Sequence, residues 1–252
     1  SKFDARHLTQ LLDEFTMTME SRERPPLLVI LPITFYVYAR TSFPSLTGGD
    51  AGELLAEACQ LGTPHPPGYP LFTMLIHTAM RISSMLVPGW SSENGLPSAA
   101  GAPALVANLL SCMFGSIAAL FLALTVEEWN SRRAVPYASS AGAFAAAGLF
   151  SFSPLTWEYS IGAEVFALNN MLIMLILYLT VRVANETSSS AGIRWAYVGS
   201  FVCGLALSNQ HTSLLAIIPL VGSVLLILNK EILRCPLKHI SGLAMCALLG
   251  LL

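Results

Sequence analysis

Two carboxylates lie close together in a polar, turn-rich segment between two apolar stretches of the sequence. Asp50 and Glu53 follow a pair of glycines, and their spacing of three places both side chains on one face of a helix that begins near Asp50. Such a carboxylate can act as a general base that takes the proton of an attacking hydroxyl. In the alternative, Asp50 only caps this helix by accepting from backbone amides, and Glu53 only faces solvent.

Two further polar motifs carry groups that can bind an anion. His65 precedes two prolines, which hold the chain extended, so its ring can donate to a departing phosphate. The same motif can instead be a rigid corner between two helices. The turn at residues 209–212 interrupts an apolar stretch, and such a turn must satisfy its polar groups internally or line a water-filled cavity. Gln210 and His211 are therefore also candidates for phosphate binding. In the alternative, the turn only breaks the helix, and its polar groups are satisfied by hydrogen bonds within the protein.

The elements that position these groups must lie in a membrane. Of the 252 residues, 54% are hydrophobic and 11% are charged, with a mean hydropathy of +0.62, whereas a soluble domain has about 25% charged residues. A net charge of −2 argues against nucleic acid, which usually requires a basic patch. The five cysteines are scattered, without the close spacing of a zinc or redox site, so we interpret them as small hydrophobic residues.

The apolar segments predict an all-α polytopic membrane helix bundle. A span needs about 20 mostly apolar residues. Spans are expected at residues 26–40, 103–126, 135–152, 165–183 and 195–228, the last as two short helices around the polar turn, and a further span begins near Ile240. The sequence therefore predicts one membrane domain over residues 26–252 with about six or seven spans, preceded by a tail at residues 1–25.

Basic residues lie mainly on one side of these spans. Only Arg40 and Arg81 fall on the other side. The rest are Lys2, Arg6, Arg22, Arg24, Arg132, Arg133, Arg182, Arg194, Lys230, Arg234 and Lys238. Because cytoplasmic loops carry an excess of lysine and arginine, the tail is expected in the cytosol, where Leu8, Leu11, Leu12 and Phe15 give it the stripe of an amphipathic helix. The segments 41–102, 153–164 and 208–212 then share the lumenal face.

The segment at residues 69–87 is apolar enough to suggest another crossing. His77 and Arg81 lie in its middle, and a charge at the bilayer centre is costly. A crossing here would also move Arg132 and Arg133 to the lumenal side. We therefore expect an amphipathic helix on the lumenal membrane surface, the second such helix of the first loop.

The ordered motifs resemble a known group of enzymes. The chain resembles the GT-C superfamily of lipid-phosphate-sugar glycosyltransferases in the order of three features. These are a short span, an acidic motif that opens one surface helix, and a proline pair that opens a second. More closely, the chain resembles the eukaryotic transmembrane O-mannosyltransferases that modify IPT domains of plexin-type receptors, and bacterial relatives share the first two motifs. The resemblance covers about residues 35–228. It rests on residues 49–53 (GDAGE), 65–72 (HPPGYPLF), 150–154 (FSFSP) with Trp157, 163–166 (AEVF) through 169–170 (NN), and 209–212 (NQHT).

That resemblance implies a multi-pass enzyme of the endoplasmic reticulum membrane. It implies inverting transfer of mannose from dolichyl phosphate mannose to Ser or Thr of lumenal IPT domains. Asp50 or Glu53 is then the catalytic base, with Asp50 preferred. The residues expected to bind the donor phosphate or sugar are His65, Glu164, Asn169, Gln210 and His211. Glu164 can alternatively cap the helix that begins after it, and we interpret Trp157 and Tyr159 as an interfacial aromatic belt rather than as platforms for a sugar.

Two features set this chain apart from the family pattern. Family members have a basic residue just before the asparagine that Asn108 matches, whereas Val106 and Ala107 stand here. The family's remaining spans and its lumenal C-terminal repeat domain are missing, so the sequence is expected to be a fragment.

No metal or other cofactor is expected. Two carboxylates and an imidazole would suit magnesium or manganese, but enzymes that use dolichyl phosphate monosaccharides resemble metal-free cases. Two other classes stay open: a transporter, since broken helices with polar groups also describe that class, and a non-catalytic lipid-binding or assembly subunit.

Overall fold

Helices make up the described part of the chain. The computed structural model describes residues 27–86, 102–130 and 136–251, and these residues contain helices and turns but no strand. The predicted all-α fold is therefore confirmed. The expected helix in residues 1–25 and the basic pair Arg132 and Arg133 lie outside the described residues.

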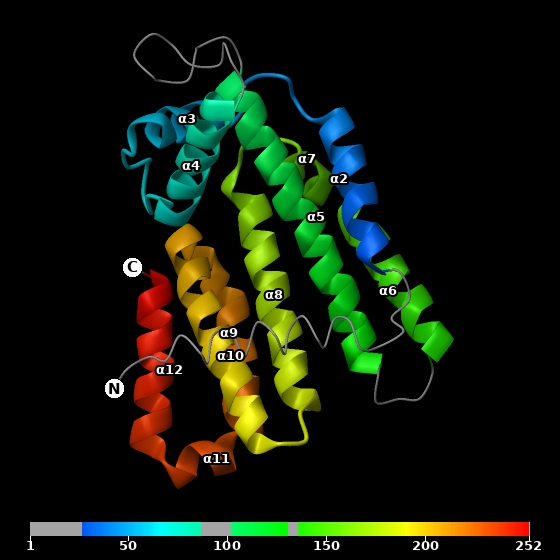
Figure 1. The fold of residues 1–252 in the computed structure, drawn as a ribbon, viewed down its shortest axis with the longest axis vertical. Helices are drawn as coiled ribbons and strands as arrows, with labels where there is room; N and C mark the ends of the chain where they lie inside the picture. The colour runs from blue at the N-terminus through cyan, green and yellow to red at the C-terminus, as the bar shows by residue number, and fades with distance from the viewer. Residues whose placement is uncertain (1–26, 87–101, 131–135, 252) are drawn as a thin grey trace.

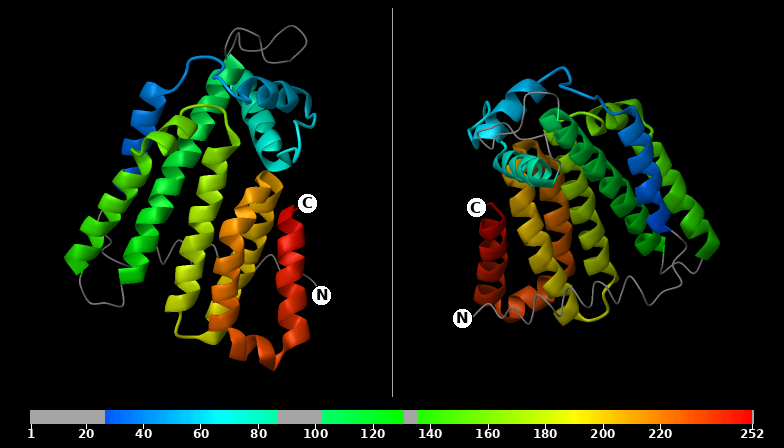
Figure 2. Two further views of the ribbon diagram at one scale, coloured as in Figure 1. Left: turned by 180° about the vertical axis from the view of Figure 1, so that it is seen from behind. Right: turned by 45° about the horizontal axis from the view of Figure 1, so that its top comes forward.

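The longer helices run alternately up and down a bundle (Figures 1 and 2). The alternating arrangement follows the predicted order of spans. The helices are α2 (Ile30–Thr41), α5 (Ala102–Asn130), α6 (Pro136–Ser151), α8 (Val165–Asn185), α9 (Ser189–Asn209), α10 (Leu214–Ile227) and α12 (Pro236–Leu251). A 3-10 turn, η1 (Leu27–Val29), precedes α2, and the short helices α7 (Pro154–Ser160) and α11 (Asn229–Arg234) connect longer ones.

Three helices are long and apolar enough to cross a membrane by length and composition. They comprise Pro103–Asn130, Val165–Asn185 and Ser190–Asn209, and four shorter apolar helices accompany them in the described residues. The predicted break in the segment 195–228 is confirmed, because α9 ends at Asn209 and the 3-10 turn η3 (His211–Ser213) separates it from α10. The last helix begins at Pro236 rather than near Ile240, since proline is well suited to the first turn of a helix.

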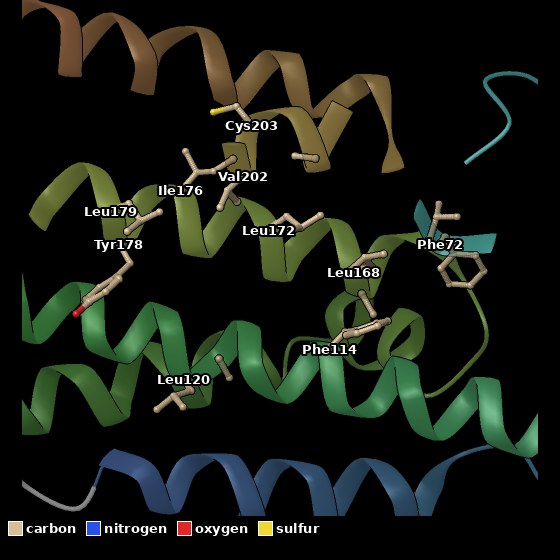
Figure 3. Close-up of a cluster of buried hydrophobic side chains, with 14 of the residues drawn as sticks. Phe72, Phe114, Leu120, Leu168, Leu172, Ile176, Tyr178, Leu179, Val202 and Cys203 are labelled. Atoms are coloured by element: carbon tan, nitrogen blue, oxygen red, sulfur yellow. The ribbon is translucent and has the colours of Figure 1, made fainter. Parts of the chain in front are cut away.

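The core lies between α5 and its neighbours. Helix α5 packs against α8 on one side and against α2 and α6 on the other. Figure 3 shows Phe114 of α5 beside Leu168 of α8, and the side chains of Ile176 and Val202 where α8 meets α9. Aliphatic and aromatic side chains therefore hold together helices that are far apart in sequence.

Helices α3 (Ala51–Gln60) and α4 (Pro70–Leu86) cover one end of the bundle (Figure 1). Each buries an apolar face, with Leu54 of α3 and Phe72 and Ile76 of α4 at most 1% exposed. His77 in α4 lies 2.8 Å from the Ala58 carbonyl oxygen through Nδ1, so its ring contributes to the packing of α4 on α3. The two predicted helices of the first loop are confirmed, while their contact with a membrane surface stays a prediction.

The three motif-bearing segments meet at this same end. Residues 42–69, 160–164 and 208–213 connect helices that enter and leave there (Figures 1 and 2), and we call this the motif end. At the opposite end, Arg182 pairs with Glu128 at 3.5 Å and lies 5.2 Å from the Trp195 ring. The grouping of the motifs at one end agrees with the charge pattern, and the side of the membrane on which they lie stays a prediction.

Candidate functional site

Asp50 stands at the start of α3 with its carboxylate exposed. Among the described residues its side chain makes no capping hydrogen bond, so the interpretation of Asp50 as a side-chain cap is wrong. Its backbone N–H instead donates to the carboxylate of Glu164. The carboxylate that occupies the positive end of α3 therefore belongs to Glu164, more than 100 residues away, and that of Asp50 remains available.

Glu164 connects the loop before α8 to the glycine pair before α3. Gly49 has φ +69°, and a Cβ added there would lie 2.9 Å from Glu164 Oε1. Glu164 makes no capping bond to α8 within the described chain, so its interpretation as the cap of its own helix is wrong. Burial raises the pKa of the Glu164 carboxyl, and the nearby Asp50 charge raises it further.

Glu53 binds His65 with both carboxylate oxygens. The His65 backbone N–H donates to Oε1 at 2.6 Å, and the ring Nδ1 lies 3.0 Å from Oε2. Glu53 therefore fixes the loop between α3 and α4, which excludes a purely solvated role. On its other side the His65 ring places Nε2 3.7 Å from Asp50 Oδ2 and 3.3 Å from the Tyr69 hydroxyl. His65 is thus both a corner of the loop and a neighbour of the candidate base.

This ion pair predicts a measurable titration. Hydrogen bonds from His65 lower the pKa of Glu53, and the hydrogen bond to Glu53 raises the pKa of His65. The Glu53 contribution to stability is complete above its ordinary pKa of 4.5 and is lost as the pH falls. The His65 contribution is complete below its ordinary pKa of 6.5 and is lost as the pH rises through the raised value. The pair therefore stabilises the loop most between these pH values.

In an NMR titration, Glu53→Gln is expected to move the His65 pKa down toward its ordinary value, because the substitution removes the main cause of the shift. The His65 signal is assigned by its loss in His65→Gln. Glu57→Gln, one turn further along α3, is the matched control and should leave the titration unchanged. An identical titration in the wild type and Glu53→Gln would contradict the pairing.

The polar turn between α9 and α10 is partly tied to α8. Asn209 Nδ2 donates to the Val165 carbonyl at 3.2 Å, and the Ser213 hydroxyl donates to Asn169 Oδ1 at 2.5 Å. Asn169 is only 8% exposed, so the structure places it inside the helix packing. The amide oxygens of Asn209 and Gln210 are buried without a hydrogen-bond partner among the described residues. Hydrogen bonds within the described residues therefore satisfy only some of the polar groups at this helix break.

His211 is exposed and lies beside a small cavity. This cavity of about 110 Å³ separates the proline motif from the polar turn, with Pro67, Tyr69 and Pro70 on one side and Ser208, Asn209 and His211 on the other. His211 thus lies across the cavity from the proline motif, whereas Gln210 does not line the cavity. Asp50, Glu53, His65 and Glu164 form the acidic group on the far side of Tyr69.

Tyr69 joins the two halves of the site and was not among the expected site residues. Its ring lines the cavity, and its hydroxyl faces His65 at 3.3 Å. The residue has φ +46°, an unfavourable conformation for a side chain with a Cβ, and such strain often accompanies a functional position. The only signal in the sequence is its place after Gly68 in the proline motif.

Asn108 is a second residue whose role sequence reasoning missed. It is 1% exposed within α5, and its Nδ2 donates to the carbonyls of Phe43 and Ser45 at 2.8 and 3.0 Å. These bonds hold the loop that leads from α2 to the glycine pair. A buried amide in an apolar helix was the available signal, since polar groups in such helices usually have a specific partner.

Trp157 and Tyr159 pack within the chain. The Trp157 indole N–H donates to the Thr41 hydroxyl at 3.1 Å, and its ring lies 6.2 Å from that of Tyr38. The Tyr159 ring lies 4.5 Å from Phe166. Both aromatic residues therefore join α7 to neighbouring helices, and their place at a membrane interface stays a prediction.

The described residues contain no group of at least three His, Cys, Asp or Glu side chains that could hold a metal ion. The expectation of a reaction without metal stays a prediction.

Comparison with known proteins gives a consistent family match. Residues 50–233 match the family described as "Protein O-mannosyl-transferase TMEM260 N-terminal domain". The chain is 40% identical to the mouse protein O-mannosyl-transferase TMEM260 over 214 residues, which cover 82% of this chain and 27% of that protein. It is 37% identical to the Dictyostelium discoideum protein of the same description over 224 residues, 85% of this chain and 25% of that protein. The chain thus spans about a quarter of the length of these relatives, and no solved structure matches it.

Proposed function

This chain belongs to the protein O-mannosyl-transferase TMEM260 N-terminal domain family, and we propose that it forms the membrane module of a protein O-mannosyltransferase. The observation that carries the proposal is the convergence of separate motifs at one end of an apolar bundle. Carboxylates from α3 and from the loop before α8 meet His65 and Tyr69 there, and a cavity beside them leads to His211.

The donor is dolichyl phosphate mannose, and the acceptors are Ser or Thr hydroxyls of IPT domains in receptor ectodomains. A lipid-linked donor would present its sugar at the boundary between an apolar bundle and water, and the site lies at such an end. The motif end then faces the lumen of the endoplasmic reticulum, with the N-terminus in the cytosol. The charge distribution supports this orientation.

Asp50 is the general base in this proposal. Both oxygens of Glu53 are occupied by His65, whereas the Asp50 carboxylate is exposed. Asp50 takes the proton of the acceptor hydroxyl as the oxygen attacks the anomeric carbon from the face opposite the phosphate. The bond between that carbon and the phosphate oxygen breaks, its electron pair leaves with the phosphate, and the configuration is inverted. Glu53 and Glu164 act as positioning residues, since they hold His65 and the backbone of Asp50.

The phosphate lies on the His211 side of Tyr69. Three carboxylates, Asp50, Glu53 and Glu164, would repel a phosphate placed among them. The cavity beyond Tyr69 instead offers the ring of His211, a donor suited to charge that builds on a departing phosphate. Gln210 and Asn169 act indirectly in this proposal, because the Ser213 hydroxyl, in the same turn as His211, donates to the Asn169 amide oxygen and to the Gln210 backbone carbonyl.

The test is mannose transfer by the full-length protein in membrane vesicles. Radiolabelled dolichyl phosphate mannose and a purified IPT domain are expected to give an alkali-labile mannosyl protein, and GDP-mannose should be inactive in washed vesicles. Transfer from GDP-mannose alone would reject the lipid donor. Movement of the labelled lipid across the bilayer without any transfer would favour a transporter.

A further inference from the structure

The loop between α2 and α3 exposes apolar side chains next to the candidate base. Residues 42–49 form this loop, which contains no helix or strand and passes over the end of the bundle (Figure 1). Phe43 is 44% exposed and Leu46 is 56% exposed, and Pro44 between them is also exposed. Neither Phe43 nor Leu46 takes part in the chemistry proposed above. Large apolar side chains that gather on a surface often mark a place where a partner binds.

The backbone of this loop is fixed although its apolar side chains are exposed. The buried Asn108 donates to the carbonyls of Phe43 and Ser45 at 2.8 and 3.0 Å. Thr47 packs closely on Gly162, where an added Cβ would lie 2.8 Å from the Thr47 methyl carbon. A loop that is already ordered loses little conformational entropy when a partner covers it. The loop is therefore well suited to bind a partner with its side chains.

The partner of this loop is not the hydrocarbon of the bilayer. Irregular backbone exposed to lipid does not occur in the hydrocarbon region, because its N–H and C=O groups would lack hydrogen-bond partners there. The loop therefore lies in water at the motif end, and Phe43 and Leu46 can leave water only by contact with a protein.

The charge around the loop indicates what kind of protein this is. The segments 41–69 and 153–164 contain no lysine or arginine, and Arg40 at the end of α2 is the nearest basic residue in sequence. The same segments carry five carboxylates, on Asp50, Glu53, Glu57, Glu158 and Glu164. Such a surface repels anionic lipid headgroups and favours a partner with basic residues.

The position of Leu46 indicates that the acceptor protein covers it. Leu46 precedes Asp50 by four residues, so the two lie at most about 14 Å apart. A specific interface buries about 800 Å² on each partner, and a patch of this area extends over such a distance. A folded domain that places a hydroxyl at Asp50 would therefore also contact Leu46.

We propose that residues 42–49 form the docking surface for the folded acceptor domain. Phe43 and Leu46 contact an apolar patch of the acceptor, and basic residues beside the modified hydroxyl face the carboxylates around Asp50. The inference rests on the proposed function and adds how the acceptor is held.

Leu46→Gln in the full-length protein is the test variant, and Leu61→Gln is its matched control. Both leucines are 56% exposed, and Leu61 lies at the far end of α3. Leu46→Gln should raise the KM for a purified IPT domain about tenfold and leave kcat unchanged, because it removes a contact made equally in the ground and transition states. Leu61→Gln should retain the wild-type KM. An unchanged KM in folded Leu46→Gln, or an equal rise in both variants, would overturn the proposal.

The salt dependence of the wild type tests the charge of the partner. Added salt screens exposed charges, so the KM for the IPT domain should rise with salt concentration. A KM that stays constant or falls would reject a basic partner.

Photocrosslinking tests the contact without relying on activity. A photoreactive phenylalanine analogue in place of Leu46 should crosslink the IPT domain in membrane vesicles, whereas the same analogue in place of Leu61 should not. Crosslinks from position 46 to lipid, or to another part of the same chain, would overturn the proposal.

The two measurements also separate this inference from the proposed function. Crosslinking of the IPT domain at position 46 without mannose transfer would retain the docking surface and reject the transferase. Mannose transfer without this crosslink would reject the docking surface alone.

Discussion

Asp50→Asn in the full-length protein is expected to lower the rate of mannose transfer by about 10²–10⁴-fold, the usual contribution of a general base. The amide cannot accept the proton of the acceptor hydroxyl. The fold should persist, because the Asp50 side chain makes no capping bond within the described residues and Glu164 binds the backbone N–H. The measurement is the single-turnover rate with dolichyl phosphate mannose and an IPT domain.

Two variants on the same helix make this result specific. Glu57→Gln carries the same type of change outside the acidic group and should retain the wild-type rate. Glu53→Gln disturbs His65, so its loss of activity should be accompanied by the change in the His65 titration. Full activity in Asp50→Asn together with complete loss in Glu53→Gln would assign the base to Glu53.

Gly49→Ala is expected to reduce transfer about 100-fold, the scale of loss caused by a misplacement of about 1 Å. Gly49 has φ +69°, a conformation that costs a residue with a Cβ about 1–2 kcal/mol. The new Cβ would also lie 2.9 Å from Glu164 Oε1, so the Glu164 carboxylate must shift from its position beside the start of α3. The main effect should be on kcat, because the proposed position of the donor phosphate is beyond Tyr69.

The adjacent glycine provides the control for this substitution. Gly48→Ala places a Cβ with no described atom within 4 Å and without a positive φ, so it should retain nearly full activity. The two variants differ by one position and are otherwise the same change. Equal activity in both would show that the contact between Glu164 and the start of α3 has no part in catalysis.

Local patterns were sufficient to predict the longer helices and their order, but not the short helices α7 and α11. Apolar segments of span length predicted the bundle, and the polar turn at 209–212 predicted the break between α9 and α10. The boundaries shifted because hydropathy reports only the apolar part of a helix. Helix α5 continues to Asn130, and α9 begins at Ser189 rather than near Trp195. Polar residues can extend a helix beyond its apolar part when they form ion pairs with neighbouring helices, as Glu128 of α5 does with Arg182 of α8.

The sequence by itself determined which segments are helical, that they form an apolar bundle, and that the polar motifs share one end. These properties depend on composition and on neighbours a few residues apart. Only the tertiary structure decided that Glu164 holds the backbone of Asp50, that Glu53 is occupied by His65, and that Tyr69 divides the acidic group from the cavity. Such contacts follow from how helices distant in sequence pack together, which no local pattern specifies.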